Sequence, residues 1–293
     1  MPDADQNVFP LLVGETMAQL NEVFDIATRY FKQVWWVPGN HELYSSSRAA
    51  EDEMHLRGES KYMACVLAAK KWGVLTPEDE YITWDYADAH GEQHCALVCP
   101  VFTLYDYSFR PADVSREKCL EWAMEEGINA TDEHLLHPDP YGSRDEWCHR
   151  LVQQSATKLE AAAATGIPTI IINHWPLRED LVYIPLVPRF SLWCGTKLTD
   201  DWHLRFNAKV VVSGHLHVRR TDWKDGVRFE EVSLGYPKQW QDAKNAGNDV
   251  NDLMREILPG PETPEPGKEP PTDWRRWTGD GSEKFGFGKP SNH

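Results

Sequence analysis

Apolar and polar positions alternate along this chain in blocks that are typical of an α/β protein. From Thr16 to Phe31 the apolar residues recur at helical spacing, and Thr16 with Gln19 forms a capping box that marks the start of a helix. Residues 8–13 (VFPLLV) predict a short buried strand before this helix, and the run VWWVP from Val34 predicts another strand after it. A strand, a helix and a strand followed by a polar loop indicate a parallel α/β unit, whose sites lie beyond the carboxyl ends of the strands.

The same alternation continues through the middle of the chain. The pattern predicts helices near residues 59–71, 115–126 and 144–164, and strands near 81–86, 96–102, 169–172 and 209–212, with one more from Gly226. The runs TIII and KVVV are β-branched and short enough for buried strands, and a polar residue and then a histidine follow each of them. From residue 242 onward, crowded prolines with Glu and Gly predict a mostly disordered tail over 242–293, which leaves 1–241 as one folded domain.

Composition narrows the class of protein. A hydrophobic content of 41% with 26% charged residues is ordinary for a globular protein, and no apolar run approaches the ~18 residues of a membrane span. The net charge of −16 repels a phosphate backbone, so nucleic acid is not favoured as a partner. The six cysteines form no CxxC pair, and the N-terminus lacks the pattern of a signal peptide, which favours a reducing, cytoplasmic setting.

Candidate metal ligands stand at the ends of three predicted strands. They lie in the segments 39–42 (GNHE), 173–174 (NH) and 214–217 (GHLH). Imidazole nitrogens bind zinc, iron, manganese and related ions, and an amide oxygen can complete such a site. A single histidine at a strand end is more often a hydrogen-bonded structural residue than a ligand. The three segments together, each after a β run, indicate a metal site.

The series GNHE, NH and GHxH, in this order, resembles the calcineurin-like metallophosphoesterase family. The match runs from Val34 to His217, which is most of the expected folded domain. The resemblance implies an α/β fold built as a four-layer α/β/β/α sandwich, here missing its first strand. It also implies metal-dependent hydrolysis of a phosphomonoester or phosphodiester, with a small phosphorylated substrate.

The resemblance assigns roles to five residues of this sequence. Asn40, His174 and His215 would ligate the second metal ion, and His217 would ligate the first. His41 would be the catalytic residue beside the scissile phosphate. The intact family site holds two divalent ions, and the resemblance does not distinguish Mn, Fe, Zn or Mg.

The chemistry explains why such residues are needed together. A phosphoester is an anion that repels hydroxide, and two cations about 3.5–4 Å apart neutralise it and activate a water molecule near neutral pH. A histidine donor then assists departure of the alcohol. Gly39 and Gly214, next to these ligands, would let the backbone turn sharply toward one pocket.

The sequence departs from the family pattern at its N-terminal side. Neither the family's Asp-x-His motif nor its Gly-Asp-x-x-Asp motif stands before GNHE, and Glu15 is a poor substitute for a bridging aspartate. The chain would therefore hold one metal ion or none. Two interpretations stay open: a hydrolase impaired by loss of the N-terminal ligands, or a catalytically inactive metallophosphoesterase-like binding or scaffold protein.

Two further residues are candidates for contact with substrate. Trp175 directly follows a predicted ligand, which favours a place in the pocket. Arg110 lies in YDYSFR after a predicted strand and could hold a phosphate oxygen, although a salt-bridged arginine on the surface is at least as compatible with the sequence.

Overall fold

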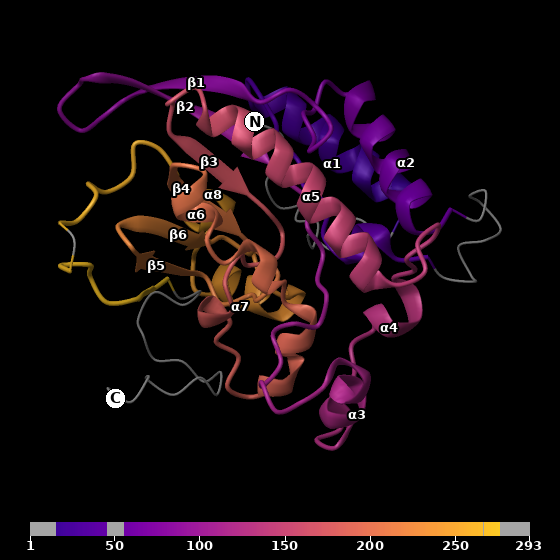
Figure 1. Cartoon of the computed structure of the whole chain (residues 1–293). Coiled ribbons are helices and arrows are strands. Elements are labelled where there is room, and N and C mark those ends of the chain that lie inside the picture. The colour runs from indigo at the N-terminus through magenta and orange to yellow at the C-terminus, as the bar shows by residue number, and fades with distance from the viewer. Residues whose placement is uncertain (1–15, 46–55, 266, 276–293) are drawn as a thin grey trace.

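One mixed β-sheet forms the centre of the computed structural model, which describes residues 16–45, 56–265 and 267–275 (Figure 1). The sheet has seven strands in the order β1-β2-β3-β4-β6-β5-β7. The strand bounds are β1 (Ile82–Ala87), β2 (Gln93–Pro100), β3 (Thr169–Ile172), β4 (Ala208–Ser213), β5 (Arg220–Lys224), β6 (Val227–Glu231) and β7 (Asp273–Trp274). The strand expected at 8–13 and the residue Glu15 lie outside the described residues.

The direction of the strands decides where the site lies. Strands β2, β3, β4 and β6 are parallel, while β1 pairs antiparallel with β2, and β5 pairs antiparallel with both β6 and β7. The carboxyl ends of β3 and β4 therefore meet at the same edge of the sheet, and the segments NH and GHLH follow them there. The strands expected at 169–172 and 209–212 are confirmed.

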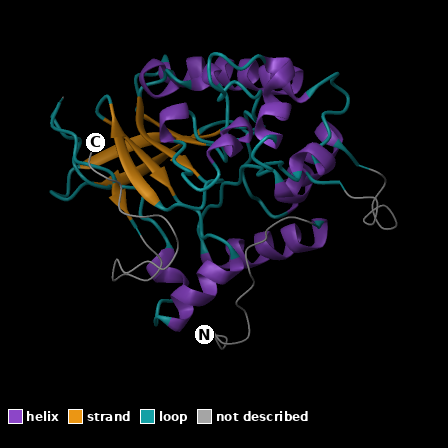
Figure 2. Cartoon of the chain, turned by 90° about the horizontal axis from the view of Figure 1, so that it is seen from below, coloured by secondary structure: helices purple, strands orange, loops and turns teal. Residues whose placement is uncertain are grey.

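Helices lie around the sheet (Figure 2). The α-helices are α1 (Met17–Tyr30), α2 (Gly58–Lys71), α3 (Cys119–Met124), α4 (Asp132–Leu135), α5 (Arg144–Ala163), α6 (Trp202–Arg205), α7 (Pro237–Asn245) and α8 (Val250–Leu253). The 3₁₀ helices are η1 (His41–Leu43), η3 (Arg116–Lys118), η4 (Glu179–Leu181), η5 (Pro188–Trp193) and η6 (Lys197–Thr199). The three long predicted helices correspond to α1, α2 and α5, and the one expected near 115–126 is split between η3 and α3.

Helix α1 shows how the sequence produces the local structure. The Thr16 hydroxyl accepts a hydrogen bond from the Gln19 backbone N–H at 3.2 Å, and the Gln19 side chain accepts one from the Thr16 N–H at 3.1 Å. The expected capping box is therefore confirmed, and it satisfies two N–H groups that the helix itself leaves without partners. The apolar face buries Leu20 and Phe24 against α2.

Different hydrophobic clusters pack on the two faces of the sheet. Leu97, Ile171 and Val211 belong to the main core, together with buried residues of α5. The sequence neighbours of these three residues belong to a separate cluster, because successive side chains of a strand point to opposite faces of the sheet. Trp35, Trp84, Ile257 and Leu258 pack against that second cluster. The second face is thus covered by side chains from the N-terminal and C-terminal parts of the described chain.

The strand expected from Val34 is reduced to a single parallel bridge between Trp35 and Leu75. Leu75 donates its N–H to the Val34 carbonyl at 3.0 Å, and Trp36 donates to the Leu75 carbonyl at 2.8 Å. Two residues further on, both segments have a proline, Pro38 and Pro77, which has no N–H to continue the ladder. The bridge still places the GNHE segment that follows it.

The segment beyond residue 242 contains ordered contacts in its described part. Helix α7 continues to Asn245, α8 follows, and β7 pairs with β5. Glu230 on β6 is fully buried and accepts hydrogen bonds from Arg255 at 2.8 Å and Arg275 at 3.1 Å. A buried carboxylate needs such partners, so ion pairing orders a segment whose composition predicted disorder. A domain boundary at residue 242 stays a prediction, and residues 276–293 lie outside the described residues.

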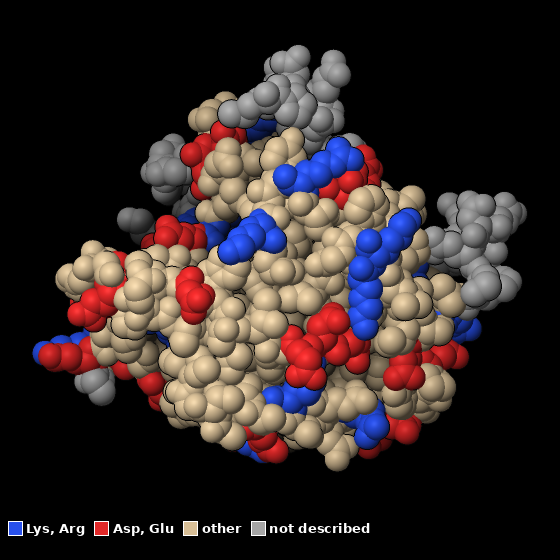
Figure 3. Space-filling model, turned by 90° about the horizontal axis from the view of Figure 1, so that it is seen from above, with Lys and Arg blue, Asp and Glu red and all other residues tan. Residues whose placement is uncertain are grey.

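The α/β class agrees with the sequence pattern. The four-layer α/β/β/α sandwich expected from the sequence contains two β layers. All the strands among the described residues belong to one mixed sheet, with helices around it. On the face shown in Figure 3, Lys and Arg side chains lie interspersed with Asp, Glu and uncharged residues. Within the described ranges, no helix is both long enough and apolar enough to cross a membrane.

Candidate metal centre

Three of the predicted ligands converge at one edge of the sheet. Asn40 precedes η1, His174 follows β3 and His215 follows β4. The His174 Nε2 atom lies 3.2 Å from the Asn40 Oδ1 atom and 3.1 Å from the His215 Nδ1 atom. Residues separated from His174 by 134 and 41 positions in the chain therefore bring an oxygen and a nitrogen within 3.2 Å of its Nε2 atom.

These distances fit a common metal ion. Ligand bonds of about 2.1 Å place neighbouring donor atoms about 3.0 Å apart in an octahedral site and about 3.4 Å apart in a tetrahedral one. The two measured separations fall within that range. Two imidazoles and an amide oxygen are a donor set suited to zinc, iron or manganese.

His217 and His41 lie near this pair of histidines, although among the described residues no three of the four rings bring ligand nitrogens within 4.8 Å of one another. The pKa of His174 lies well below its usual range, first because the ring is buried and then because His215, His217 and His41 are close to it. Burial with the nearby histidines lowers the pKa of both His215 and His217 to about 4. Neutral imidazole is the form that binds a metal ion, so these rings are ready to ligate near neutral pH without first losing a proton. The Nδ1 atom of His217 is buried and has no hydrogen-bond partner among the described residues, as a free ligand position requires.

The GHLH loop has an unusual backbone. His215, His217 and Arg219 have φ angles of 71°, 57° and 45°, which cost about 1–2 kcal/mol for each residue other than glycine. The Glu231 carboxylate holds this conformation by accepting the N–H groups of His217 at 3.2 Å and Arg219 at 2.6 Å. Arg275 also donates its backbone N–H to the Arg219 carbonyl at 2.8 Å. The strain is therefore offset by partners from β6 and from the C-terminal segment.

The glycines of the site act differently from the expectation. Neither Gly39 nor Gly214 has a positive φ, so neither is needed for a sharp turn. A Cβ atom on Gly39 would lie 2.8 Å from the His174 Cε1 atom and 2.8 Å from a Glu42 carboxylate oxygen. The same Glu42 oxygen accepts the Gly39 N–H at 2.8 Å, and burial raises the pKa of this carboxyl to about 7. Gly39 is thus required by the close approach of His174 and Glu42.

Two expected substrate contacts are corrected. Trp175 is fully buried and its ring lies 4.8 Å from the His174 ring, so it supports a ligand from behind and does not face a substrate. Arg110 donates hydrogen bonds to the carbonyls of Val114 and Tyr107, both at 2.9 Å. Its guanidinium therefore braces its own loop through backbone carbonyls, which differs from both the phosphate contact and the salt bridge expected from the sequence.

The structure also brings residues to the site that the sequence did not indicate. Asp132 and Tyr44 both contact the Asn40 side chain, and Glu231 supports the loop that carries His217. Tyr44 lies four residues after Asn40 in one short 3₁₀ segment, which is a local signal. Asp132 is 92 residues away from Asn40, and no local pattern relates the two.

Comparison with known proteins shows the family to which this chain belongs. The family model for calcineurin-like phosphoesterases matches residues 11–219, which include all five predicted site residues. The chain belongs to the calcineurin-like phosphoesterase family and is a metal-dependent phosphoester hydrolase by class. The family generally uses a dinuclear metal site.

A curated relative is similar over most of its length. The [acyl-carrier-protein] phosphodiesterase PptH of Mycobacterium tuberculosis is 41% identical over 256 residues, covering 86% of this chain and 75% of the relative. The crystal structure of phosphopantetheinyl hydrolase (PptH) from the same organism superposes with a TM-score of 0.74, at 41% identity, covering 85% of this chain and 84% of that one. These similarities support a phosphodiester as the bond that is hydrolysed.

Proposed function

We propose that this chain hydrolyses the phosphodiester that joins a phosphopantetheinyl group to a carrier protein. The relative named as an [acyl-carrier-protein] phosphodiesterase supports this substrate, because the similarity extends over most of both chains. A protein-bound phosphodiester then takes the place of the small phosphorylated substrate expected from the sequence. The observation that carries the proposal at the site is the 3.1 and 3.2 Å spacing of the donor atoms around His174.

Asn40, His174 and His215 would hold one divalent ion, with His217 beside it for a second. A bound ion supplies charge neutralisation of the phosphate and a hydroxide equivalent near neutral pH. His41 lies near enough to His174, His215 and His217 to lower the pKa of each ring. In the proposed reaction His41 donates a proton to the departing oxygen of the carrier protein. The phosphorus–oxygen bond to the carrier protein breaks, and water supplies the new phosphorus–oxygen bond of the released monoester.

The number of ions held by this chain is part of the proposal. Asn40, His174 and His215 offer three ligand atoms to one ion, and His217 is the one predicted ligand left for a second. We therefore expect one tightly held ion at Asn40, His174 and His215, and a weaker second one at His217. Metal analysis of the purified protein after dialysis tests this, and two retained ions per chain would contradict it.

Activity is tested with a phosphopantetheinylated carrier protein in the presence of Mn²⁺. Mass spectrometry should show the carrier protein losing the mass of the phosphopantetheinyl group, and the His215→Ala variant should leave it intact. A bis-aryl phosphate measured in parallel reports phosphodiester chemistry without the carrier protein. Metal binding without turnover of either substrate would support the catalytically inactive binding protein instead.

A further inference from the structure

The side chain of Asn40 is held by two groups outside the histidine cluster. Its Nδ2 atom donates to the Tyr44 hydroxyl oxygen at 2.9 Å and to the Asp132 Oδ1 atom at 3.0 Å. The Tyr44 hydroxyl in turn donates to the same Asp132 oxygen at 2.5 Å. All three residues are buried, with 7%, 9% and 2% of their surface exposed for Asn40, Tyr44 and Asp132.

This network fixes which end of the amide faces the histidines. An ionised carboxylate can only accept hydrogen bonds, so Asp132 requires the NH₂ end of Asn40 and the hydroxyl hydrogen of Tyr44. With its hydrogen directed at Asp132, the Tyr44 oxygen has a lone pair left for the second N–H of Asn40. The Oδ1 atom of Asn40 is thereby turned away from Asp132, and it lies 3.2 Å from His174 Nε2. An amide flipped by 180° would present an N–H where a cation needs an oxygen.

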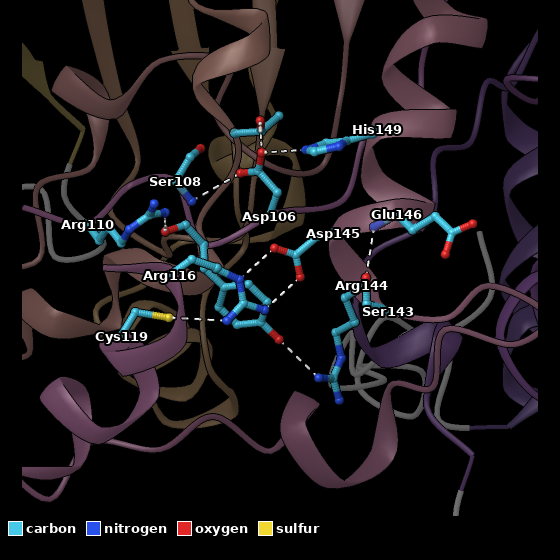
Figure 4. A network of polar contacts seen from close by, with 12 residues as sticks. Asp106, Ser108, Arg110, Arg116, Cys119, Ser143, Arg144, Asp145, Glu146 and His149 are labelled. Atoms are coloured by element: carbon cyan, nitrogen blue, oxygen red, sulfur yellow. Dashed lines mark hydrogen bonds and ion pairs between the residues drawn. The ribbon is translucent and has the colours of Figure 1, made fainter. Parts of the chain in front are cut away.

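Asp132 itself is fixed by interactions away from the metal centre. Arg144, at the start of α5, donates to the backbone carbonyls of Asp132 at 2.7 Å and Leu136 at 2.8 Å. The same guanidinium contacts the Glu133 carboxylate at 2.8 Å and the Tyr107 hydroxyl at 3.0 Å. Figure 4 shows Arg144 reaching this hydroxyl beside the Arg116–Asp145 pair. Helix α4 is therefore clamped at both ends before any ion binds.

The second oxygen of Asp132 points to a functional use for this carboxylate. Its Oδ2 atom is buried and has no hydrogen-bond partner among the described residues. A purely structural carboxylate in such a place would be expected to satisfy both oxygens, because a buried, incompletely paired charge is costly. A cation held by Asn40 offsets that cost through the polarised amide.

We infer that Asp132 and Tyr44 are positioning residues that orient the Asn40 amide so that its oxygen is presented to the metal ion. The inference rests on the proposed role of Asn40 as a metal ligand. Partners of this kind, which hold a ligand from behind, typically change metal affinity 10-fold to 100-fold when removed. Asp132 and Tyr44 both contact the Asn40 side chain, and the Tyr44 ring also lies 4.8 Å from the His41 ring.

The test is a titration of the metal-free protein with Co²⁺, followed by its visible absorption. Asp132→Ala is expected to weaken Co²⁺ binding about 10-fold to 100-fold. Asp132→Asn keeps an acceptor oxygen for both Asn40 and Tyr44, so it should restore affinity to within about threefold of the wild type. Tyr44→Phe removes one hydroxyl and keeps the ring that lies 4.8 Å from the His41 ring, so a loss of about threefold to tenfold is expected.

Asp106 provides the matched control. It is another buried aspartate, and its carboxylate accepts hydrogen bonds from Thr196 at 2.9 Å and from the Ser108 N–H at 3.1 Å (Figure 4). Asp106→Ala should lower the melting temperature and leave Co²⁺ affinity unchanged. Circular dichroism shows whether each variant is folded. If Asp132→Ala does not fold, the Co²⁺ affinity of Tyr44→Phe tests the positioning role.

Each result bears on one of the two proposals. If the wild type binds no Co²⁺, the proposed metal centre itself fails. If the wild type binds and folded Asp132→Ala or Tyr44→Phe binds equally well, only the positioning role fails. If Asp132→Ala and Asp106→Ala weaken Co²⁺ binding equally, the effect is explained by general destabilisation of the protein. If Asp132→Asn and Asp132→Ala weaken Co²⁺ binding equally, the charge of Asp132 explains the effect, and the orientation of the Asn40 amide does not. Either result overturns the inference.

Discussion

Adding a single methyl group at Gly39 tests whether the metal centre depends on close packing behind His174. In Gly39→Ala the new Cβ atom would lie 2.8 Å from His174 Cε1, 3.0 Å from His174 Nδ1 and 2.8 Å from a Glu42 oxygen. Ordinary contacts between carbon atoms are about 3.5–4.0 Å, so the His174 ring must move by about 0.7 Å or more. The φ angle of Gly39 is not positive, so alanine does not strain it. The steric clash of the new Cβ atom is therefore the perturbation that this variant tests.

The expected effect follows from that displacement. Metal sites tolerate ligand displacements of about 0.5 Å, so a larger shift of His174 should weaken metal binding about 10-fold to 100-fold, or about 1.4–2.8 kcal/mol. Overpacking should also lower the free energy of unfolding by about 1–3 kcal/mol. Co²⁺ titration measures the first quantity and urea denaturation of the metal-free protein measures the second.

Gly214→Ala is the matched control, because this glycine also adjoins a ligand and also lies beside His174. Its Cβ atom would lie 3.5 Å from the Ser233 hydroxyl and 3.8 Å from His174 Nδ1, which are ordinary contacts. This variant should bind Co²⁺ like the wild type. The reasoning is refuted if Gly39→Ala binds Co²⁺ with unchanged affinity, or if both alanine variants lose affinity to the same degree.

Three other outcomes are expected. His41→Ala should lower kcat for a bis-aryl phosphate about 10²-fold to 10⁴-fold while Co²⁺ affinity is kept, and an equal loss of affinity would make His41 a ligand instead. His215 and His217 should each make the metal-free protein less stable on acidification from pH 6.5 to 4, because folding lowers their pKa from 6.5 to about 4 and the unfolded chain then binds more protons, whereas the raised pKa of Glu42 acts in the opposite direction. The slope is at most about 1.4 kcal/mol per pH unit for each histidine, and urea denaturation of the wild type and of His217→Ala at several pH values isolates it; an identical slope in the two proteins would contradict the assignment. Glu230→Ala should lower the free energy of unfolding by about 3–5 kcal/mol, because Arg228, Arg255 and Arg275 lose their buried counterion. Urea denaturation measures this change, and a value below about 1 kcal/mol would show that these arginines find other partners.

The sequence by itself determined the local elements and the types of ligand. The helix from Met17 and the strand Thr169–Ile172 follow from apolar periodicity and from a capping box, which involve neighbours in the chain. The histidines after β3 and β4 could be placed at one edge because parallel strands share the direction of their carboxyl ends. These conclusions depend on short-range regularities that a sequence displays directly.

Tertiary structure decided the features that depend on contacts between distant segments. The contact of Asp132 with Asn40, the close approach of His174 to Gly39 and the pairing of Arg275 with Glu230 have no local pattern. The described C-terminal segment is ordered because a buried carboxylate needs its arginines, although the composition of that segment predicts disorder. Burial and long-range pairing are properties of the folded chain, so only the assembled structure shows which residues hold Asn40 and His174 in place.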